Sequence, residues 1–251
     1  MKIDLSGKVA VITGGSRGLG RAMAETLSGA GASIALVARD QARLDQASAE
    51  LKAQGGTAVG FVADVTDEAD VQRVTGEINA VFGAPHILIN NAGNNVRKHL
   101  AELSLEEFRS VLDGSLTSTF LMSRALTPGM TGRGYGRVIN MTSMLSHISL
   151  PGRTPYSSAK TGLLGFTRAL ALELASEGIT VNGISPGPFG TDMNRPVMDD
   201  PQANAQFLAN LPVGRWGRVE EIGALACYLC SEQAGFITGT DIVIDGGWTA
   251  K

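Results

Sequence analysis

The sequence predicts an α/β fold in which one doubly wound parallel sheet carries helices on both faces. Short, continuously apolar segments alternate with longer segments in which apolar residues recur at helical spacing. Strands buried on both faces have the first pattern, and parallel strands need a crossover, usually a helix, to connect them. No linker or internal repeat divides the 251 residues, so we expect one domain spanning 1–251.

The expected strands are the apolar runs at residues 9–12, 33–38, 58–63, 86–90, 136–141, 180–185 and 241–244. Apolar residues three and four apart predict helices near residues 19–30, 42–54, 68–82, 104–131, 155–177 and 219–231. Gly114 and Pro128 weaken the long helical stretch, because glycine lowers helix propensity and proline removes a backbone donor. The proline-rich residues 186–212 are expected to form an irregular substrate loop. Right-handed crossovers make such a sheet doubly wound.

The overall composition is that of a soluble globular protein, with 43% hydrophobic residues and a net charge of −3. The positive charges are not clustered, which argues against a nucleic-acid partner. The apolar runs are too short to span a bilayer, and residues 1–5 lack the apolar region of a signal peptide. We therefore expect no membrane partner and a cytoplasmic location.

Cys227 and Cys230 form a C-x-x-C pair, which in other settings indicates a redox or zinc site. Here the pair lies inside an apolar helical run, and free cysteine is among the most buried residue types. His86, His99 and His147 have no ligand spacing with each other or with the cysteines. We therefore expect two core cysteines and no metal site.

A glycine-rich turn follows the first strand, where residues 13–20 read Thr-Gly-Gly-Ser-Arg-Gly-Leu-Gly and lead into a helical run. A helix N-terminus presents free N–H groups and a partial positive charge, which together hold a pyrophosphate. Residues that directly follow the other strands are also polar or contain glycine. In an open parallel sheet these residues meet at one edge, where ligands bind, so a Rossmann-type nucleotide site is expected there.

Several motifs occur together, in order, along nearly the whole chain. They comprise Thr13, Gly14, Gly18, Gly20, Asp64, Asn90, Asn91, Ala92, Gly93, Ser143, Tyr156, Lys160, Asn182, Pro186, Gly187, Asp245, Gly246 and Gly247. In this spacing the chain resembles the short-chain dehydrogenase/reductase family. The resemblance implies a nicotinamide-dependent oxidoreductase, usually a homotetramer, that acts on a small alcohol or carbonyl compound.

The same resemblance implies a set of cofactor-binding residues. They are Gly14, Ser16, Arg17, Gly18, Leu19, Gly20, Arg39, Asp64, Val65, Asn91, Ala92, Gly93, Tyr156, Lys160, Pro186, Gly187, Phe189 and Thr191. Family proteins use the lysine at the Lys160 position to hold the nicotinamide ribose.

The residue types of Tyr156, Lys160 and Ser143 suit proton transfer. Tyr156 and Lys160 share one helix face, and a nearby ammonium lowers the pKa of a phenol, which is otherwise about 10. Tyr156 can then exchange a proton with an alcohol or carbonyl, while Ser143 donates a hydrogen bond to the same substrate oxygen. We expect these three residues, together with Ser115, to be catalytic.

One position departs from the family pattern. The family commonly has asparagine where this chain has Ser115, and that asparagine completes a proton relay through a water near the lysine. A hydroxyl is shorter than an amide and has fewer hydrogen-bonding groups. Either water fills the gap at Ser115 and catalysis persists, or the relay is weakened. In the second case the chain is a nucleotide-binding protein of the same fold with impaired catalysis.

The choice of cofactor depends on the end of the second strand. An acidic residue there binds the adenosine ribose hydroxyls of NAD(H), whereas a nearby arginine accommodates the 2′-phosphate of NADP(H). Ala38 occupies the acidic position, Arg39 follows it, and Arg17 lies in the glycine-rich turn. We therefore expect NADP(H) to be favoured over NAD(H). The alternative is that Arg39 pairs with Asp40 or Asp45.

Residues 94–99, 144–154 and 188–211 should select the substrate. Arg97 and Lys98 can attract a carboxylate or phosphate, and equally can form a solvated or subunit-contact face. Residues 95–98, 214–217 and 246–248 are similar to family members that act on sugar acids, such as gluconate 5-dehydrogenases. Acyl-carrier-protein reductases share much of the same pattern. His147 either lines the pocket or is a loop residue without catalytic duty.

Overall fold

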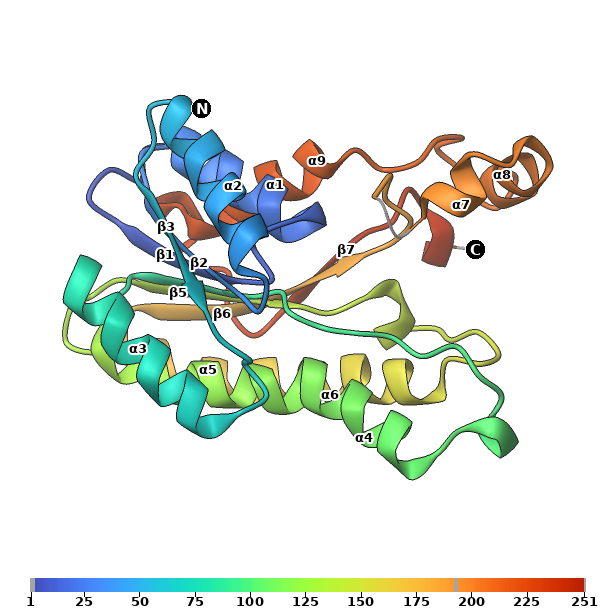
Figure 1. The fold of residues 1–251 in the computed structure, drawn as a ribbon, viewed down its shortest axis with the longest axis horizontal. Coiled ribbons are helices and arrows are strands. Elements are labelled where there is room, and N and C mark those ends of the chain that lie inside the picture. Colours follow the sequence, from blue (N-terminus) through green and yellow to red (C-terminus); the bar gives the residue numbers. More distant parts are fainter. Residues whose placement is uncertain (1–2, 192–193, 251) are drawn as a thin grey trace.

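The computed structural model describes residues 3–191 and 194–250. Within these residues, seven parallel strands form one sheet in the order β3-β2-β1-β4-β5-β6-β7 (Figure 1). The strands are β1 Val9–Thr13, β2 Ser33–Ala38, β3 Ala58–Val62, β4 Ile87–Asn90, β5 Gly136–Met141, β6 Ile179–Pro186 and β7 Asp241–Ile244. The predicted doubly wound parallel sheet is confirmed.

The helices cover both faces of this sheet. They are α1 Gly18–Gly29, α2 Gln41–Ala53, α3 Glu68–Phe82, α4 Leu105–Leu112, α5 Ser118–Leu126, α6 Thr154–Leu174, α7 Arg195–Met198, α8 Pro201–Leu208 and α9 Val219–Cys230. Figure 1 shows α1, α2 and α9 on one face and α3, α5 and α6 on the other. Carboxylate caps begin two of them: Asp40 accepts from Arg43 N at α2, and Asp67 accepts from Asp70 N at α3.

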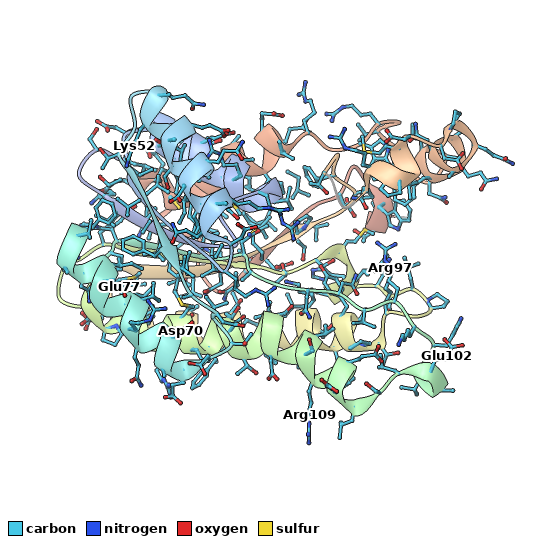
Figure 2. All side chains as sticks on the ribbon, viewed as in Figure 1. Lys52, Asp70, Glu77, Arg97, Glu102 and Arg109 are labelled. Atoms are coloured by element: carbon cyan, nitrogen blue, oxygen red, sulfur yellow. The ribbon has the colours of Figure 1, made fainter. Side chains whose placement is uncertain are left out.

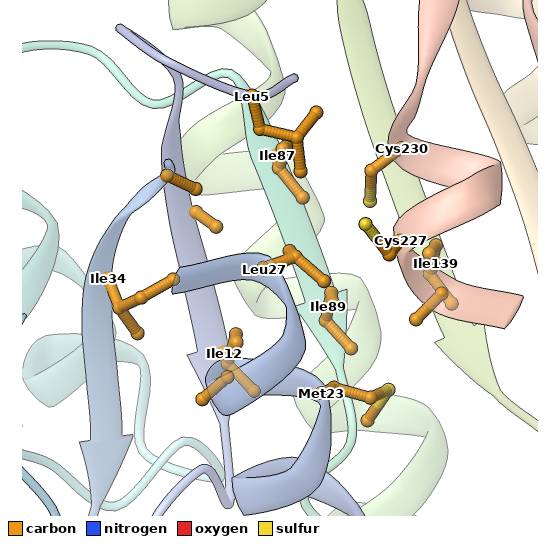
Figure 3. Close-up of a cluster of buried hydrophobic side chains, with 14 of the residues drawn as sticks. Leu5, Ile12, Met23, Leu27, Ile34, Ile87, Ile89, Ile139, Cys227 and Cys230 are labelled. Atoms are coloured by element: carbon orange, nitrogen blue, oxygen red, sulfur yellow. The ribbon is translucent and has the colours of Figure 1, made fainter. Parts of the chain in front are cut away.

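Alternation along the strands divides the core into two layers. Ile12 packs with Met23 and Leu27 of α1 (Figure 3), and Ala10 lies in the same cluster. Val11 between them packs with α3 and α5 on the opposite face. A central strand such as β1 is therefore apolar on both sides, which produces the continuous apolar run in the sequence. Cys227 and Cys230 lie in the first layer as free, buried side chains of α9, as predicted.

The long helical stretch is interrupted near both predicted weak points. A π-helical turn, Asp113–Thr117, separates α4 from α5, and a 3₁₀ turn, Thr127–Met130, follows α5. At Gly114 a Cβ would lie 2.3 Å from Asn94 Oδ1, so only glycine admits the Asn94 side chain here. The expectation of an irregular segment at 186–212 was wrong in part, because this segment contains the short helices α7 and α8. Asp200 caps α8 by accepting from Gln202 N and Ala203 N.

Candidate active site

The carboxyl ends of β1 and β4 meet at the point where the strand order reverses. Thr13 Oγ1 accepts hydrogen bonds from the backbone N–H groups of Asn91 and Ala92, at 2.9 and 3.0 Å. The Asn91 amide donates in turn to the carbonyls of Thr13 and Gly14, at 3.0 and 3.2 Å. These bonds fix the segment after β4 against the glycine-rich turn. The two predicted motifs are therefore one structural unit, placed where doubly wound folds bind nucleotides.

The glycine-rich turn leaves the N-terminus of α1 open to an anion. Arg17 occupies the cap position without a capping side chain, and the first turn has no acidic residue. Gly14 and Gly18 have φ angles of 62° and 56°, in the region that favours glycine. A Cβ at Gly20 would lie 2.4 Å from the Gly14 carbonyl oxygen, so the helix and the turn pack with no room for a side chain. Free N–H groups beside a bare backbone are what a dinucleotide pyrophosphate requires, and the residues present fit it.

The arginines expected to select the cofactor flank this turn. Arg17 and Arg39 are exposed, and Arg39 follows the half-buried Ala38 at the end of β2. Arg39 Nη1 lies 3.9 Å from Asp64 Oδ2, at the limit of an ion pair, and its side chain is 79% exposed. Arg39 makes no ion pair with Asp40 or Asp45 in the described part of the chain. Asp40 pairs with Arg43, and Asp45 accepts from Gln41.

Ser143 and Tyr156 are brought together at the end of β5. Ser143 caps a short 3₁₀ turn, Met144–Ser146, and its side chain hydrogen-bonds with the Tyr156 phenol in the first turn of α6. Burial raises the pKa of Tyr156, whereas Ser143 and the positive charge of Arg153 oppose that rise. The expected lowering of this pKa by Lys160 stays a prediction.

Lys160 lies one helical turn beyond Tyr156 and is buried. Its ammonium donates to the Met141 carbonyl at 2.5 Å and lies 5.6 Å from the centre of the Tyr156 ring. Burial lowers the pKa of Lys160 to about 8. The lysine is thus held between the tyrosine and the end of β5, at a position from which it can reach a nucleotide bound along this edge.

Ser115 lies on the π-helical turn, close to Gly93. Its side chain is buried, and its Oγ has no hydrogen-bond partner among the described residues. A Cβ built on Gly93 would lie 3.1 Å from Ser115 Oγ and 3.8 Å from Lys160 Nζ. Ser115 and Lys160 therefore both lie close to Gly93, and a proton relay through Ser115 stays a prediction.

The remaining predicted residues lie along the same edge. Val65 follows β3 and is buried, and Pro186 ends β6. Gly187 donates to the Ile244 carbonyl, and its backbone packs so closely on Asp245 that a Cβ would lie 2.5 Å away. Phe189 is buried and packs against Gly217, so its side chain belongs to the core. Thr191 donates its N–H to the Phe189 carbonyl.

Two features near the site escaped the sequence analysis. Arg153, immediately before α6, is half-buried close to Tyr156, and the Arg97 guanidinium adds to burial in lowering its pKa. The second is the contact of His147 with Asp241 of β7, at 2.7 Å. The position of Arg153 three residues before Tyr156, at the helix start, was a usable signal. The His147 contact joins residues 94 apart in the sequence and has no local pattern.

Two further observations concern membranes and metals. None of the helices within 3–191 and 194–250 is both long and apolar enough to cross a bilayer. The same residues hold no group of three or more histidine, cysteine or acidic side chains arranged for a metal ion.

Comparisons with known proteins agree on one family. A family model described as enoyl-(acyl carrier protein) reductase matches residues 14–249. The chain is 38% identical over 245 residues to the 3-oxoacyl-acyl-carrier-protein reductase FabG of Escherichia coli, covering 98% of each. A candidate gluconate dehydrogenase from Agrobacterium tumefaciens matches with a TM-score of 0.96 and 37% identity, over 100% of this chain and 99% of that one. A candidate NAD(P)-dependent gluconate 5-dehydrogenase from Beutenbergia cavernae, solved with bound NADP, matches with a TM-score of 0.94 and 33% identity over 100% of both chains.

Proposed function

The chain belongs to the short-chain dehydrogenase/reductase family of NAD(P)-dependent enzymes that act on CH–OH groups, and on this basis we propose that it interconverts a secondary alcohol and a ketone with NADP(H). The observation that carries the proposal is the contact between Ser143 and Tyr156 beside the buried Lys160. These groups meet at the sheet edge where the glycine-rich turn would hold the dinucleotide. The bound nicotinamide would supply or accept the hydride.

Each side chain then has a distinct part in the proposed reaction. The Ser143 hydroxyl donates a hydrogen bond to the substrate oxygen, which places that oxygen beside the Tyr156 phenol. Tyr156 gives its proton to the oxygen during reduction and takes it back during oxidation. Lys160 holds the nicotinamide ribose, and its ammonium favours the phenolate form of Tyr156. Ser115 connects this lysine to solvent through water, because its hydroxyl has no hydrogen-bond partner among the described residues and, like Lys160 Nζ, lies close to Gly93.

The preference for NADP(H) is supported by charge. A 2′-phosphate at the end of β2 would lie close to Arg39 and Arg17, and Ala38 leaves no carboxylate to repel it. The NADP bound to the Beutenbergia neighbour is consistent with this preference. We further propose that the protein is cytoplasmic, as its composition predicts, and that it forms a homotetramer, as the family resemblance implies. Size-exclusion chromatography with light scattering would test the oligomeric state.

We propose a substrate that carries a carboxylate or phosphate, because Arg153 lies close to Tyr156 and Arg97 lies close to Arg153. The backbone of Lys98, next to Arg97, lies about 3.6 Å from where a Cβ on Gly152, next to Arg153, would sit. Neither Arg97 nor Arg153 has a carboxylate partner among the described residues, whereas Lys98 is paired with Glu107. Figure 2 places Arg97 on the segment after β4, in contrast to Arg109, which projects from α4 away from the molecule. A sugar acid satisfies this chemistry, as does another anionic ketone.

A substrate panel tests the proposed function. Purified protein with NADPH is offered 5-oxogluconate, an acetoacetyl thioester, a ketose and cyclohexanone, and the loss of NADPH absorbance is followed. We expect the anionic ketones to be reduced fastest. Tyr156→Phe should lower kcat by at least ~10³-fold while NADPH still binds. If the unmutated protein binds NADPH and reduces nothing, the alternative of a nucleotide-binding protein with impaired catalysis is favoured.

A further inference from the structure

A buried polar cluster, formed by Thr142, His147, Ser185 and Asp241, lies behind Ser143. The Asp241 carboxylate accepts hydrogen bonds from Thr142 Oγ1 at 2.5 Å, from Ser185 Oγ at 2.6 Å and from His147 Nε2 at 2.7 Å. Thr142 and Ser185 are almost fully buried, and the Asp241 side chain is only 10% exposed. The His147 side chain is the most exposed member of this cluster, at 35%.

The fold makes room for this carboxylate. Asp241 is the first residue of β7 and pairs in register with Gly183 of β6. A Cβ on Gly183 would lie 2.0 Å from Asp241 Oδ1, so any other residue there would displace the carboxylate. The order of groups differs from that of a hydrolytic triad, because Asp241 accepts from both Ser185 and His147 instead of being separated from the serine by the imidazole. Ser185 is fully buried, so nucleophilic chemistry is not its role.

The Ser185 hydroxyl connects this cluster to Ser143. The Ser185 hydroxyl has one proton and three buried acceptors within reach, namely Asp241 Oδ2 at 2.6 Å, the Ser143 carbonyl at 2.9 Å and Thr142 Oγ1 at 2.9 Å. Asp241 Oδ2 can accept from both His147 and Ser185, so when His147 Nε2–H donates to it, this oxygen keeps a hydrogen bond even if Ser185 turns its proton elsewhere. That proton is then available to the Ser143 carbonyl, which also accepts from Ser146 N at 2.8 Å.

We propose that His147, acting through Asp241 and Ser185, is a positioning residue for Ser143. Its hydrogen bond directs the Ser185 proton to the Ser143 carbonyl and so fixes the turn from which the Ser143 hydroxyl reaches Tyr156. Without this donor, Ser185 turns to the carboxylate, and the turn at residues 143–147 loses one of its two bonds to the Ser143 carbonyl. The consequence for turnover rests on the proposed function, but the consequence for the turn does not.

Two variants of His147 separate the effect of its hydrogen-bond donor from the effect of its size. His147→Gln keeps an N–H donor near the position of Nε2, whereas His147→Leu keeps size and removes the donor. Hydrogen–deuterium exchange of the peptide spanning residues 143–148, measured on the intact protein with and without NADPH, reports the turn directly. We expect exchange to rise ~5-fold or more in His147→Leu and to stay within about twofold of the parent in His147→Gln. His86→Leu, which removes a histidine hydrogen bond at the other end of the strands, should not change this peptide.

Turnover with the ketone that the parent reduces fastest gives the second measurement. In His147→Leu, kcat should fall ~10-fold while the NADPH dissociation constant stays unchanged, and His147→Gln should recover most of that loss. Because both residues act on one bond, His147→Leu with Ser185→Ala should be no slower than Ser185→Ala alone. Parental exchange and turnover in His147→Leu would overturn the proposal, as would additive losses in the double variant. If no ketone is reduced by the parent, the proposed function fails, and the exchange measurement still decides the role of His147.

Discussion

Ser115 Oγ and Lys160 Nζ both lie close to Gly93, at 3.1 and 3.8 Å from the position that a Cβ on that glycine would take. The serine hydroxyl is buried and has no hydrogen-bond partner among the described residues. A buried polar group without a partner lowers the free energy of unfolding. The ammonium uses one of its three donors on the Met141 carbonyl. Both the Ser115 hydroxyl and the Lys160 ammonium can therefore form further hydrogen bonds.

Replacing Ser115 by asparagine should increase turnover. The longer amide side chain extends toward Lys160 and offers both an acceptor and a donor, so it completes the relay with fewer ordered waters. We expect kcat to rise by roughly 3- to 10-fold and the NADPH dissociation constant to change by less than about twofold. Steady-state kinetics and fluorescence titration with NADPH provide the two numbers.

Gly93→Ala serves as the opposing control for that variant, because its methyl group would press on Ser115 Oγ at 3.1 Å and should slow the reaction. If Ser115→Asn is no faster than a parent that is already fast, the helix position is dispensable in this protein.

Arg39→Ala should weaken the binding of NADPH far more than that of NADH. The Arg39 side chain is 79% exposed, and its contact with Asp64, at 3.9 Å, is at the limit of an ion pair. Its guanidinium is therefore available to a 2′-phosphate. We expect the dissociation constant for NADPH to rise ~10-fold and that for NADH to change less than about twofold. Arg43→Ala is the matched control, because Arg43 is already paired with Asp40. Equal affinity of the unmutated protein for the two nucleotides would contradict the preference for NADP(H).

Lys160→Met should stabilise the protein at neutral pH. Burial lowers the pKa of Lys160 from 10.5 to about 8. The folded state therefore carries its charge at pH 7 at a cost of roughly 3 kcal/mol, which the bond to the Met141 carbonyl reduces. Between pH 8 and 10.5 the unfolded chain keeps the proton that the folded chain has lost, so the parent gains stability relative to the variant as pH rises.

Urea unfolding of both proteins at pH 7 and pH 10 measures this difference. The advantage of Lys160→Met should be largest at pH 7 and nearly absent above about pH 10.5. A difference between the two proteins that is the same at both pH values would show that burial of the charge is not its cause.

Most of the fold could be predicted because its cause is local. Val11 is buried against α3 and α5 while its neighbours Ala10 and Ile12 are buried against α1, so the run is apolar throughout. The motifs after β1 and β4 were predictable for a similar reason, since parallel strands end at one edge.

Features decided by contacts between distant segments were harder to predict. The π-helical turn at Gly114 forms against the Asn94 side chain, and Asp241 needs the bare backbone of Gly183, 58 residues earlier. The short helices α7 and α8 were missed because prolines at their starts were taken as breakers, although proline is tolerated in the first turn of a helix. Spacing along the chain carries no information on which distant side chains meet.

The last prediction concerns Arg153, whose half-buried side chain lies close to both Arg97 and Tyr156. Burial and, after it, the Arg97 guanidinium lower the pKa of Arg153, so a bound anion would relieve an existing repulsion. Arg153→Gln should therefore raise the KM for 5-oxogluconate ~10-fold or more and leave the KM for cyclohexanone within about twofold, with kcat little changed for either. Arg109→Gln is the control, because Arg109 projects from α4 away from the molecule (Figure 2). A parent enzyme that strongly prefers the uncharged ketone, with Arg153→Gln unchanged toward both, would remove the anion from the proposed substrate and leave Ser143 and Tyr156 to act on a neutral carbonyl.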